Sequence, residues 1–357
     1  MEARIKKSFI CRQVRDFQLD SQSVRFYLPQ AGDVAVFRVL KIGKHTRMQC
    51  ENGINRLILP DDLIMCTFGN RYATNQIEGY VPDKILDEYH LLAQGGVAGE
   101  VRSMFKPLEE QGPTTLQLLG YVKDLQGHII NTRFLGHKKY RFNGEKPFET
   151  QIILSLGTSM DSGKTTTAAY LCRGLRRSGK KTAYMKLTGT AFSKDADLAN
   201  DCGADVTIDF SHVGFPSTYL CSEQELLDLY ATLLHSLQRC KPEIIVIEIA
   251  DGLLQRETDM LLRSAAFMRT VDGVIFSAGD SMGALYGPDY LGQLCIRPYA
   301  LCGLFTMSPL LIQEVQGHTE TPVLNLQMLE QPEVVRLITA HNLTDKELDA
   351  QYAVATA

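Results

Sequence analysis

The sequence predicts an α/β domain with a mainly parallel sheet and helices on both faces, preceded by a small, mostly-β domain. From residue 151 onward, short apolar runs alternate with helical segments, which is the pattern of parallel strands joined by crossover helices. Before residue 145, strand-like segments are separated by Gly, Asn, Asp and Pro, and helix signals are sparse. We therefore place the mostly-β domain at residues 1–145 and the α/β domain at residues 150–357.

The first domain is predicted to be a small barrel or a sandwich, because its strand-like segments are short and bounded by turn formers. A helix is expected only at residues 82–92, and turn formers at residues 142–147 mark the linker to the second domain. The expected strands of this domain are residues 32–40, 56–59, 99–102 and 116–122.

The second domain is predicted to contain a series of buried strands. The uninterrupted apolar run at residues 244–247 is typical of a strand that is buried on both faces. Ser222 and Glu225 have the spacing of a capping box and indicate the start of a helix, while the tail from Glu330 is also expected to be helical. The expected strands are residues 152–156, 182–186, 206–208, 244–247, 274–276, 301–305 and 323–324.

A glycine-containing loop joins the first of these strands to the helix that ends near Arg177. Such a strand, loop and helix surround an anion with backbone N–H groups at the positive end of the helix dipole. Lys164 is then placed to reach the outer phosphates of a nucleotide, and Thr165 to hold Mg²⁺. The predicted nucleotide-binding residues are Gly157, Thr158, Ser159, Met160, Asp161, Ser162, Gly163, Lys164, Thr165 and Thr166.

Further charged residues follow the neighbouring predicted strands. Ligands of parallel sheets bind at the carboxyl ends of the strands. We therefore expect one crevice to be faced by Lys186, Glu248, Asp251 and Ser277. We interpret Glu248 as the acid that orients Mg²⁺, and Asp195 or Asp197 as a further metal-water contact. The predicted catalytic residues are Lys164, Lys186 and Glu248. The small and aromatic residues at 210–219 are suited to closing over a base or a substrate.

The loop, in which Gly157-Thr158 and Gly163-Lys164-Thr165 are separated by four residues, resembles the G-T-D-T-x-V-G-K-T loop of dethiobiotin synthetase and of the related cobyrinate synthetases. Lys186 resembles that family's K-P element, and residues 247–252 are similar to its V-E-G-A-G-G segment. The resemblance covers about residues 151–325 and implies a P-loop NTPase that uses ATP and Mg²⁺. It implies magnesium ligands at Thr165, Glu248 and one of Asp195 or Asp197, of which we take Asp197.

Two functions are compatible with these residues. The first, implied by the resemblance, is an ATP-hydrolysing enzyme of ligase or kinase type, which transfers the γ-phosphoryl group to a small carboxylate or carbamate acceptor that Lys186 orients. The alternative is a nucleotide-dependent switch whose β-domain binds a protein or nucleic-acid partner. The acceptor and the preference for ATP over GTP are not fixed by the sequence.

Composition restricts the class of protein further. No apolar run approaches the roughly 20 residues that cross a bilayer, so no membrane span is expected. The nine cysteines contain no C-x-x-C pair, which favours reduced thiols and a cytoplasmic protein. The net charge is −4, but the first part of the chain is mildly basic, which does not predict nucleic-acid binding by itself and leaves it open for that part. A homodimer is also left open.

Overall fold

The computed structural model describes residues 4–136 and 138–339, and its contacts divide the chain into two units. The first unit contains the chain up to residue 138 together with two short segments, residues 189–193 and 210–220. The second unit contains residues 139–188, residues 194–209 and the chain from residue 221 onward. The two short segments lie outside the range 1–145 that the sequence suggests for the first domain.

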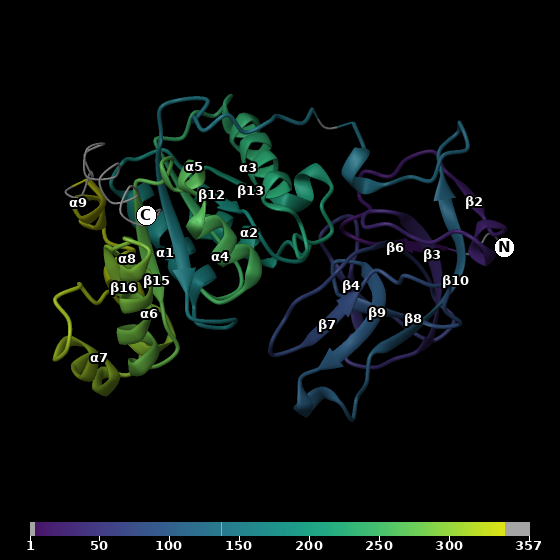
Figure 1. Ribbon diagram of the computed structural model, residues 1–357, viewed down its shortest axis with the longest axis horizontal. Helices are drawn as coiled ribbons and strands as arrows, with labels where there is room; N and C mark the ends of the chain where they lie inside the picture. Colours follow the sequence, from purple (N-terminus) through teal and green to yellow (C-terminus); the bar gives the residue numbers. More distant parts are fainter. Residues whose placement is uncertain (1–3, 137, 340–357) are drawn as a thin grey trace. The chain divides into compact units, whose positions relative to one another are not determined.

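Five strands of the first unit close into a ring, which confirms a mostly-β fold and identifies it as a barrel (Figure 1). The order around the ring is β6-β3-β10-β8-β9, and β9 pairs back onto β6 through Thr67↔Val97 and Phe68↔Ala98. The strands of this unit are β1 (Ile5–Lys7), β2 (Gln18–Asp20), β3 (Val34–Lys41), β4 (Arg47–Gln49), β5 (Asn55–Leu57), β6 (Leu63–Phe68), β7 (Ile77–Tyr80), β8 (Tyr89–Ala93), β9 (Val97–Met104) and β10 (Thr114–Lys123).

The helix expected at residues 82–92 is wrong, because residues 82–88 contain no helix and β8 begins at Tyr89. Alternate residues of β8 enter the barrel core, where the Tyr89 ring packs edge-on against Phe37 and Phe68. The period of two that this packing requires overrides the helix signal. The first unit also has short 3-10 helices at Ser23–Arg25, Lys106–Leu108, Thr132–Phe134 and Phe210–Val213.

The second unit is built on a six-stranded sheet with the order β13-β12-β14-β11-β15-β16, and all five pairings are parallel. Figure 1 shows helices on both faces of this sheet, as the alternating pattern predicts. The strands are β11 (Gln151–Gly157), β12 (Thr182–Lys186), β13 (Val206–Asp209), β14 (Ile244–Glu248), β15 (Gly273–Ser277) and β16 (Ala300–Cys302).

Two of the predicted strands differ from the structure. The segment expected at 301–305 is a strand only to Cys302, because Gly303 has a φ of 103° and a 3-10 helix, Leu304–Met307, follows it. The segment at 323–324 makes a single bridge to Leu301 instead of a strand. Both segments lie beside β16, which is the edge strand of the sheet and has three residues, so few backbone groups are available for pairing.

The helices carry the chain between parallel strands, and the capping box of Ser222 and Glu225 is confirmed at the start of α3. The helices are α1 (Lys164–Arg177), α2 (Lys194–Asp201), α3 (Glu223–Leu237), α4 (Arg256–Arg263), α5 (Ala265–Met268), α6 (Ser281–Gln293), α7 (Pro309–Gln316), α8 (Leu326–Leu329) and α9 (Val334–Thr339). Of the tail that is expected to be helical from Glu330, residues 340–357 lie outside the described residues.

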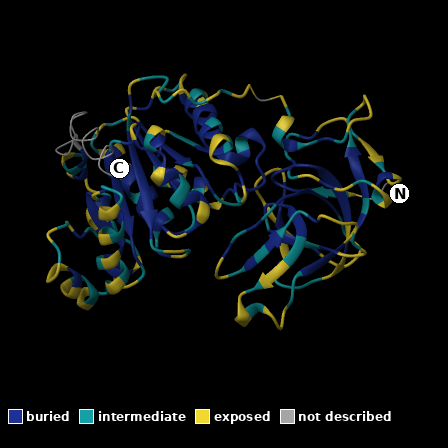
Figure 2. Ribbon diagram, viewed as in Figure 1, coloured by how far each residue is buried: buried dark blue, intermediate teal, exposed yellow. Residues whose placement is uncertain are grey.

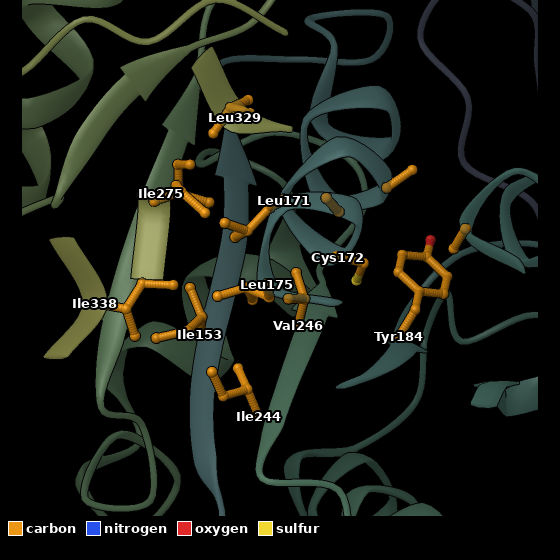
Figure 3. Close-up of a cluster of buried hydrophobic side chains, with 14 of the residues drawn as sticks. Ile153, Leu171, Cys172, Leu175, Tyr184, Ile244, Val246, Ile275, Leu329 and Ile338 are labelled. Atoms are coloured by element: carbon orange, nitrogen blue, oxygen red, sulfur yellow. The ribbon is translucent and has the colours of Figure 1, made fainter. Parts of the chain in front are cut away.

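The core of the second unit holds the loop between β11 and α1 in place. Ile153 on β11, Leu171 and Leu175 on α1, and Val246 on β14 belong to one buried cluster (Figure 3). Figure 2 shows the central strands buried along their length, and β14 is buried at all five positions. Since a strand and a helix packed this tightly leave their connecting loop little freedom, the loop geometry is set by the core.

Over the described ranges 4–136 and 138–339, no helix has both the length and the apolar character needed to cross a membrane.

Candidate functional site

The loop between β11 and α1 turns tightly around its own backbone. Gly163 has a φ of 100° directly before α1, a conformation that glycine adopts without a steric cost. A Cβ on Gly157 would lie 2.4 Å from Ser162 Oγ and 2.8 Å from the carbonyl oxygen of Ser277, so only glycine fits there. The loop therefore places the N-terminus of a 14-residue helix at the carboxyl end of β11, which is the geometry of a phosphate-binding loop.

Lys164 lies inside this loop rather than in solvent. Its Nζ donates to the carbonyl oxygen of Ser159 at 2.6 Å and to Ser162 Oγ at 3.4 Å, and the residue is 6% exposed. Burial lowers the pKa of the Lys164 ammonium, and the charge of Glu248 opposes that effect. The ammonium thus occupies the space that the loop encloses, held by neutral oxygens that a phosphate would replace.

Glu248, at the end of β14, is the centre of a hydrogen-bond network and is 2% exposed. Its Oε1 accepts from Thr165 Oγ1 at 2.9 Å and from Lys186 Nζ at 3.3 Å. Its Oε2 accepts from the hydroxyl of Tyr184 at 2.6 Å. The ring of Tyr184 belongs to the core cluster of Figure 3, so the core itself orients this carboxylate. The structure brings together Thr165, Lys186 and Glu248, three residues that the sequence predicts for the site.

Lys186 ends β12 and forms ion pairs with both Asp195 and Glu248. Burial disfavours the Lys186 ammonium, but the charges of Asp195 and Glu248 outweigh this effect and raise its pKa. Asp195 lies in the first turn of α2, where Asp197 is exposed. Asp195 thus contacts the cluster through Lys186, and the metal role that we assigned to Asp197 stays a prediction.

The oxygen atoms at this point suit Mg²⁺, which prefers hard oxygen ligands and often uses one or two protein groups together with phosphate and water. Thr165 Oγ1 and Glu248 Oε1 lie 2.9 Å apart and are the groups that would hold the ion. Within the described part of the chain, no group of three or more His, Cys, Asp or Glu residues forms a metal site. Nucleotide phosphate and water would supply the other ligands of a magnesium ion held by Thr165 and Glu248.

Two glycines that the sequence analysis did not single out border the loop. A Cβ on Gly252, which follows β14, would lie 2.3 Å from the carbonyl oxygen of Thr158. A Cβ on Gly303, which follows β16, would lie 2.4 Å from the carbonyl oxygen of Ser162. Both glycines let neighbouring loops approach the phosphate-binding loop backbone. The signal available in the sequence for Gly252 was a glycine placed shortly after a predicted strand, whereas Gly303 lay inside the strand predicted at residues 301–305. Asp251 precedes Gly252, and its part in the site stays a prediction.

The segments that leave β12 and β13 pack within the first unit. Gln49 is 2% exposed, its Nε2 donates to Ser193 Oγ at 2.7 Å, and its Oε1 accepts from Ser193 N at 3.0 Å. Thr132 Oγ1 donates to the carbonyl oxygen of Gly214 at 2.7 Å. The two segments also pair with each other, since Ala191 N donates to the carbonyl oxygen of Pro216 at 2.9 Å. Residues 210–219, which we expected to close over a base or a substrate, thus belong to the first unit.

The comparisons with known proteins concern the fold alone. No protein-family model matches the chain, and a search of curated proteins found no match either. Among solved structures, the signal recognition particle receptor FtsY from Elizabethkingia anophelis is 14% identical, with a TM-score of 0.34 over 56% of this chain and 68% of that one. The same receptor in complex with GDP is also 14% identical, with a TM-score of 0.36 over 56% and 66% of the two chains.

A third similar structure is the signal recognition particle 54 kDa protein from Aeropyrum pernix K1 in complex with GDP. It is 17% identical, with a TM-score of 0.33, and the match covers 59% of this chain and 50% of that one. Since these scores are low, the fold is assigned from this chain's own parallel sheet, loop and helix, which are those of a P-loop NTPase. The comparisons do not support the resemblance to dethiobiotin synthetase, which stays a prediction.

Proposed function

We propose that this protein hydrolyses a nucleoside triphosphate, ATP by the sequence expectation, in the presence of Mg²⁺, and that the bound nucleotide alters the first unit. It would then act as a nucleotide-dependent switch. The observation that carries this proposal is the position of residues 189–193 and 210–220 in the first unit. The first segment lies between Lys186, the last residue of β12, and α2, which contains Asp195. The second segment directly follows β13.

The chemistry follows from the charges at the loop. The backbone N–H groups of residues 157–166 and the Lys164 ammonium would bind the phosphates and stabilise the charge that develops on the transferring phosphoryl group. Mg²⁺, when bound, would neutralise further phosphate charge. Thr165 Oγ1 and Glu248 Oε1 would hold it, and Tyr184 would keep the Glu248 carboxylate in this orientation. Binding and orientation account for most of the catalysis in such sites.

The coupling to the first unit would begin at Lys186. Its ammonium contacts Glu248 Oε1, the oxygen that we assign to the metal, and a second cation at that oxygen is unfavourable because the two like charges repel. Nucleotide and metal binding would therefore shift Lys186 toward Asp195 or toward the phosphates. Asp195 lies two residues after Ser193, which Gln49 holds in the first unit by two hydrogen bonds. A shift of Lys186 and Asp195 is thus transmitted along a short stretch of chain.

The experiment combines turnover with amide hydrogen exchange on the full chain. We expect hydrolysis of ATP or GTP only with Mg²⁺, and no measurable hydrolysis by a Lys164→Ala variant that folds like wild type. We also expect nucleotide to change the exchange rates of residues 189–193 and 210–220 in wild type and not in that variant. Wild-type rates in Lys164→Ala would contradict the site, and unchanged exchange in both segments during turnover would contradict the switch.

A second candidate function is phosphoryl transfer to a small carboxylate or carbamate. The observation that favours it is the position of Lys186, a cation at the carboxyl end of β12 that contacts Glu248 beside Thr165. An enzyme of this kind should consume nucleotide mainly when a small acceptor is supplied. A switch should hydrolyse nucleotide slowly without an acceptor and faster when a macromolecular partner is added. The two functions are therefore distinguished by whether a small acceptor or a macromolecular partner raises the rate of hydrolysis.

A further inference from the structure

The first unit contains a polar cleft that has no part in the function proposed above. Its volume is about 400 Å³, which is within the range of small-molecule sites in proteins. Two adjacent segments line it: residues 72–78, which include the start of β7, and residues 103–106, which include the end of β9 and pair with the first segment. The polar side chains that line it are Tyr72, Thr74, Gln76, Glu78, Ser103 and Lys106.

Two positive charges converge on the Gln76 side chain of this cleft. Gln76 Oε1 accepts from Arg71 Nη2 at 2.6 Å and also from Lys44 Nζ. Arg71 is 7% exposed and donates in addition to the carbonyl oxygen of Leu92, while Lys44 is half-buried. Within the described ranges, no carboxylate forms an ion pair with Lys44. An ammonium and a guanidinium therefore share one neutral oxygen, which is an unfavourable arrangement of like charges.

The electrostatics of Lys44 agree with two cations that share one acceptor. Burial, together with the charge of Arg71, lowers the pKa of Lys44 to about 8. The acid of the cleft, Glu78, already accepts hydrogen bonds from the Ser103 hydroxyl and the Tyr80 hydroxyl. Its charge is thus held at β7 by neutral donors. The exposed Lys106 is the other charged side chain that lines the cleft, and Lys44 and Arg71 contact the lining residue Gln76 without lining the cleft themselves.

We propose that this cleft binds a small organic anion that carries a carboxylate or phosphate group. The anion replaces Gln76 Oε1 as the acceptor for Lys44 and Arg71, and Lys106, which lines the cleft, supplies a further positive charge. Charge-assisted hydrogen bonds to an anion are about twice as strong as those to a neutral amide oxygen, so the exchange of acceptors is favourable. The hydroxyl group of Thr74 supplies a further donor for the rest of the ligand, while the Ser103 hydroxyl remains bound to Glu78.

The test uses inorganic phosphate and citrate as probes on the full chain in a Lys164→Ala background, so that the phosphate-binding loop does not contribute. Thermal unfolding and titration calorimetry are run against sodium chloride at equal ionic strength. The informative variant is Gln76→Glu, because its carboxylate would itself neutralise Lys44 and Arg71. The matched control is Gln117→Glu, the same change of charge at an exposed position of β10.

We expect phosphate, citrate or both to raise the melting temperature above the chloride value, and the anion that acts to identify the ligand class. We expect Gln76→Glu to unfold at a higher temperature than its parent and to weaken anion binding at least about tenfold, while Gln117→Glu binds like its parent. The proposal is overturned if neither anion binds more tightly than chloride, or if Gln76→Glu binds the anion as tightly as Gln117→Glu does.

Discussion

Glu248 is the residue on which the proposed metal site depends, because one carboxylate serves Thr165, Tyr184 and Lys186. We expect Glu248→Gln to bind nucleotide, since the backbone of the phosphate-binding loop is unchanged. We expect its Mg²⁺-dependent turnover to fall by a factor of about 10²–10³, as when one stabilising group is removed from an active site. Steady-state hydrolysis and nucleotide binding, measured against Mg²⁺ concentration, check this expectation.

The control for this substitution is Asp201→Asn, the same change from acid to amide at an exposed position of α2. It should leave both measurements unchanged. Equal turnover in Glu248→Gln and wild type would remove Glu248 from the metal site, and loss of nucleotide binding would assign it a structural role instead.

His45 provides a pH-dependent prediction in the first unit. It is 3% exposed, its Nε2 lies 3.0 Å from the carbonyl oxygen of Leu92, and burial together with the charges of Arg71 and Lys44 lowers its pKa to about 3. The folded state therefore binds fewer protons than the unfolded state between pH 3 and 6.5. The contribution of His45 to stability is present above pH 6.5 and is lost as the pH falls.

From His45 alone, the free energy of unfolding should decrease by about 2 kcal/mol between pH 6.5 and pH 5, at about 1.4 kcal/mol per pH unit. Urea unfolding of wild type and His45→Gln at both pH values measures this, because Gln retains a donor for Leu92 without the titration. The variant should lose less stability over this interval. An equal loss in the two proteins would show that His45 does not titrate as the burial implies.

Individual elements of the second unit were predictable where their signal is local. The apolar run 244–247, the capping box of Ser222 and Glu225, and the strand that precedes Lys164 depend on neighbouring residues alone. The prediction failed at residues 82–92 and at 303–305. In the first case barrel packing imposes a strand, and in the second Gly303 at φ 103° ends one. Both depend on distant partners that a local pattern does not contain.

The loop after β14 offers a test of close packing around the phosphate-binding loop. A methyl group on Gly252 would lie 2.3 Å from the carbonyl oxygen of Thr158 and 2.9 Å from the Cα of Ser159. Both contacts are with backbone, so Gly252→Ala must displace residues 158–159. We expect a loss of stability of about 1–3 kcal/mol and weaker nucleotide binding, measured by unfolding and by calorimetry.

Gly279→Ala is the matched control, because a Cβ at Gly279, in the loop between β15 and α6, meets nothing within 4 Å. This variant should keep both the stability and the nucleotide affinity of wild type. If the two alanine variants behave alike, the approach of Gly252 to the loop does not matter for the site.

At the scale of the whole molecule, the sequence showed that two folds follow one another, but it did not assign residues 189–193 and 210–220 to the first. The two segments are separated from each other by α2 and β13. Their hydrogen-bond partners, such as Gln49 and Thr132, lie far away in the sequence. A reading of local pattern therefore treats them as loops of the second domain. The same limitation applies to the acids of α2. The sequence did not show which of Asp195 and Asp197 lies near Lys186, and in the structure Asp195 forms an ion pair with it.

The proposed coupling makes its sharpest prediction at Gln49, which touches none of the nucleotide-binding residues. In Gln49→Met, a side chain of similar length removes both hydrogen bonds to Ser193 and leaves a buried N–H without that acceptor. We expect a destabilisation of about 1–3 kcal/mol, and a loss of the nucleotide-dependent change in hydrogen exchange at residues 189–193. Nucleotide affinity should persist, because residues 157–166 are unaltered.

Gln94→Met is the control, since Gln94 lies in the same unit and is joined to Gln49 through its backbone carbonyl, which the substitution retains. Its exchange should respond to nucleotide as wild type does. If the exchange of residues 189–193 still responds to nucleotide in Gln49→Met, the two bonds between Gln49 and Ser193 are not needed for the response. If the variant loses both the exchange response and nucleotide binding, the substitution has damaged the nucleotide-binding site. The bonds between Gln49 and Ser193 would then have a structural role and would not transmit the nucleotide state.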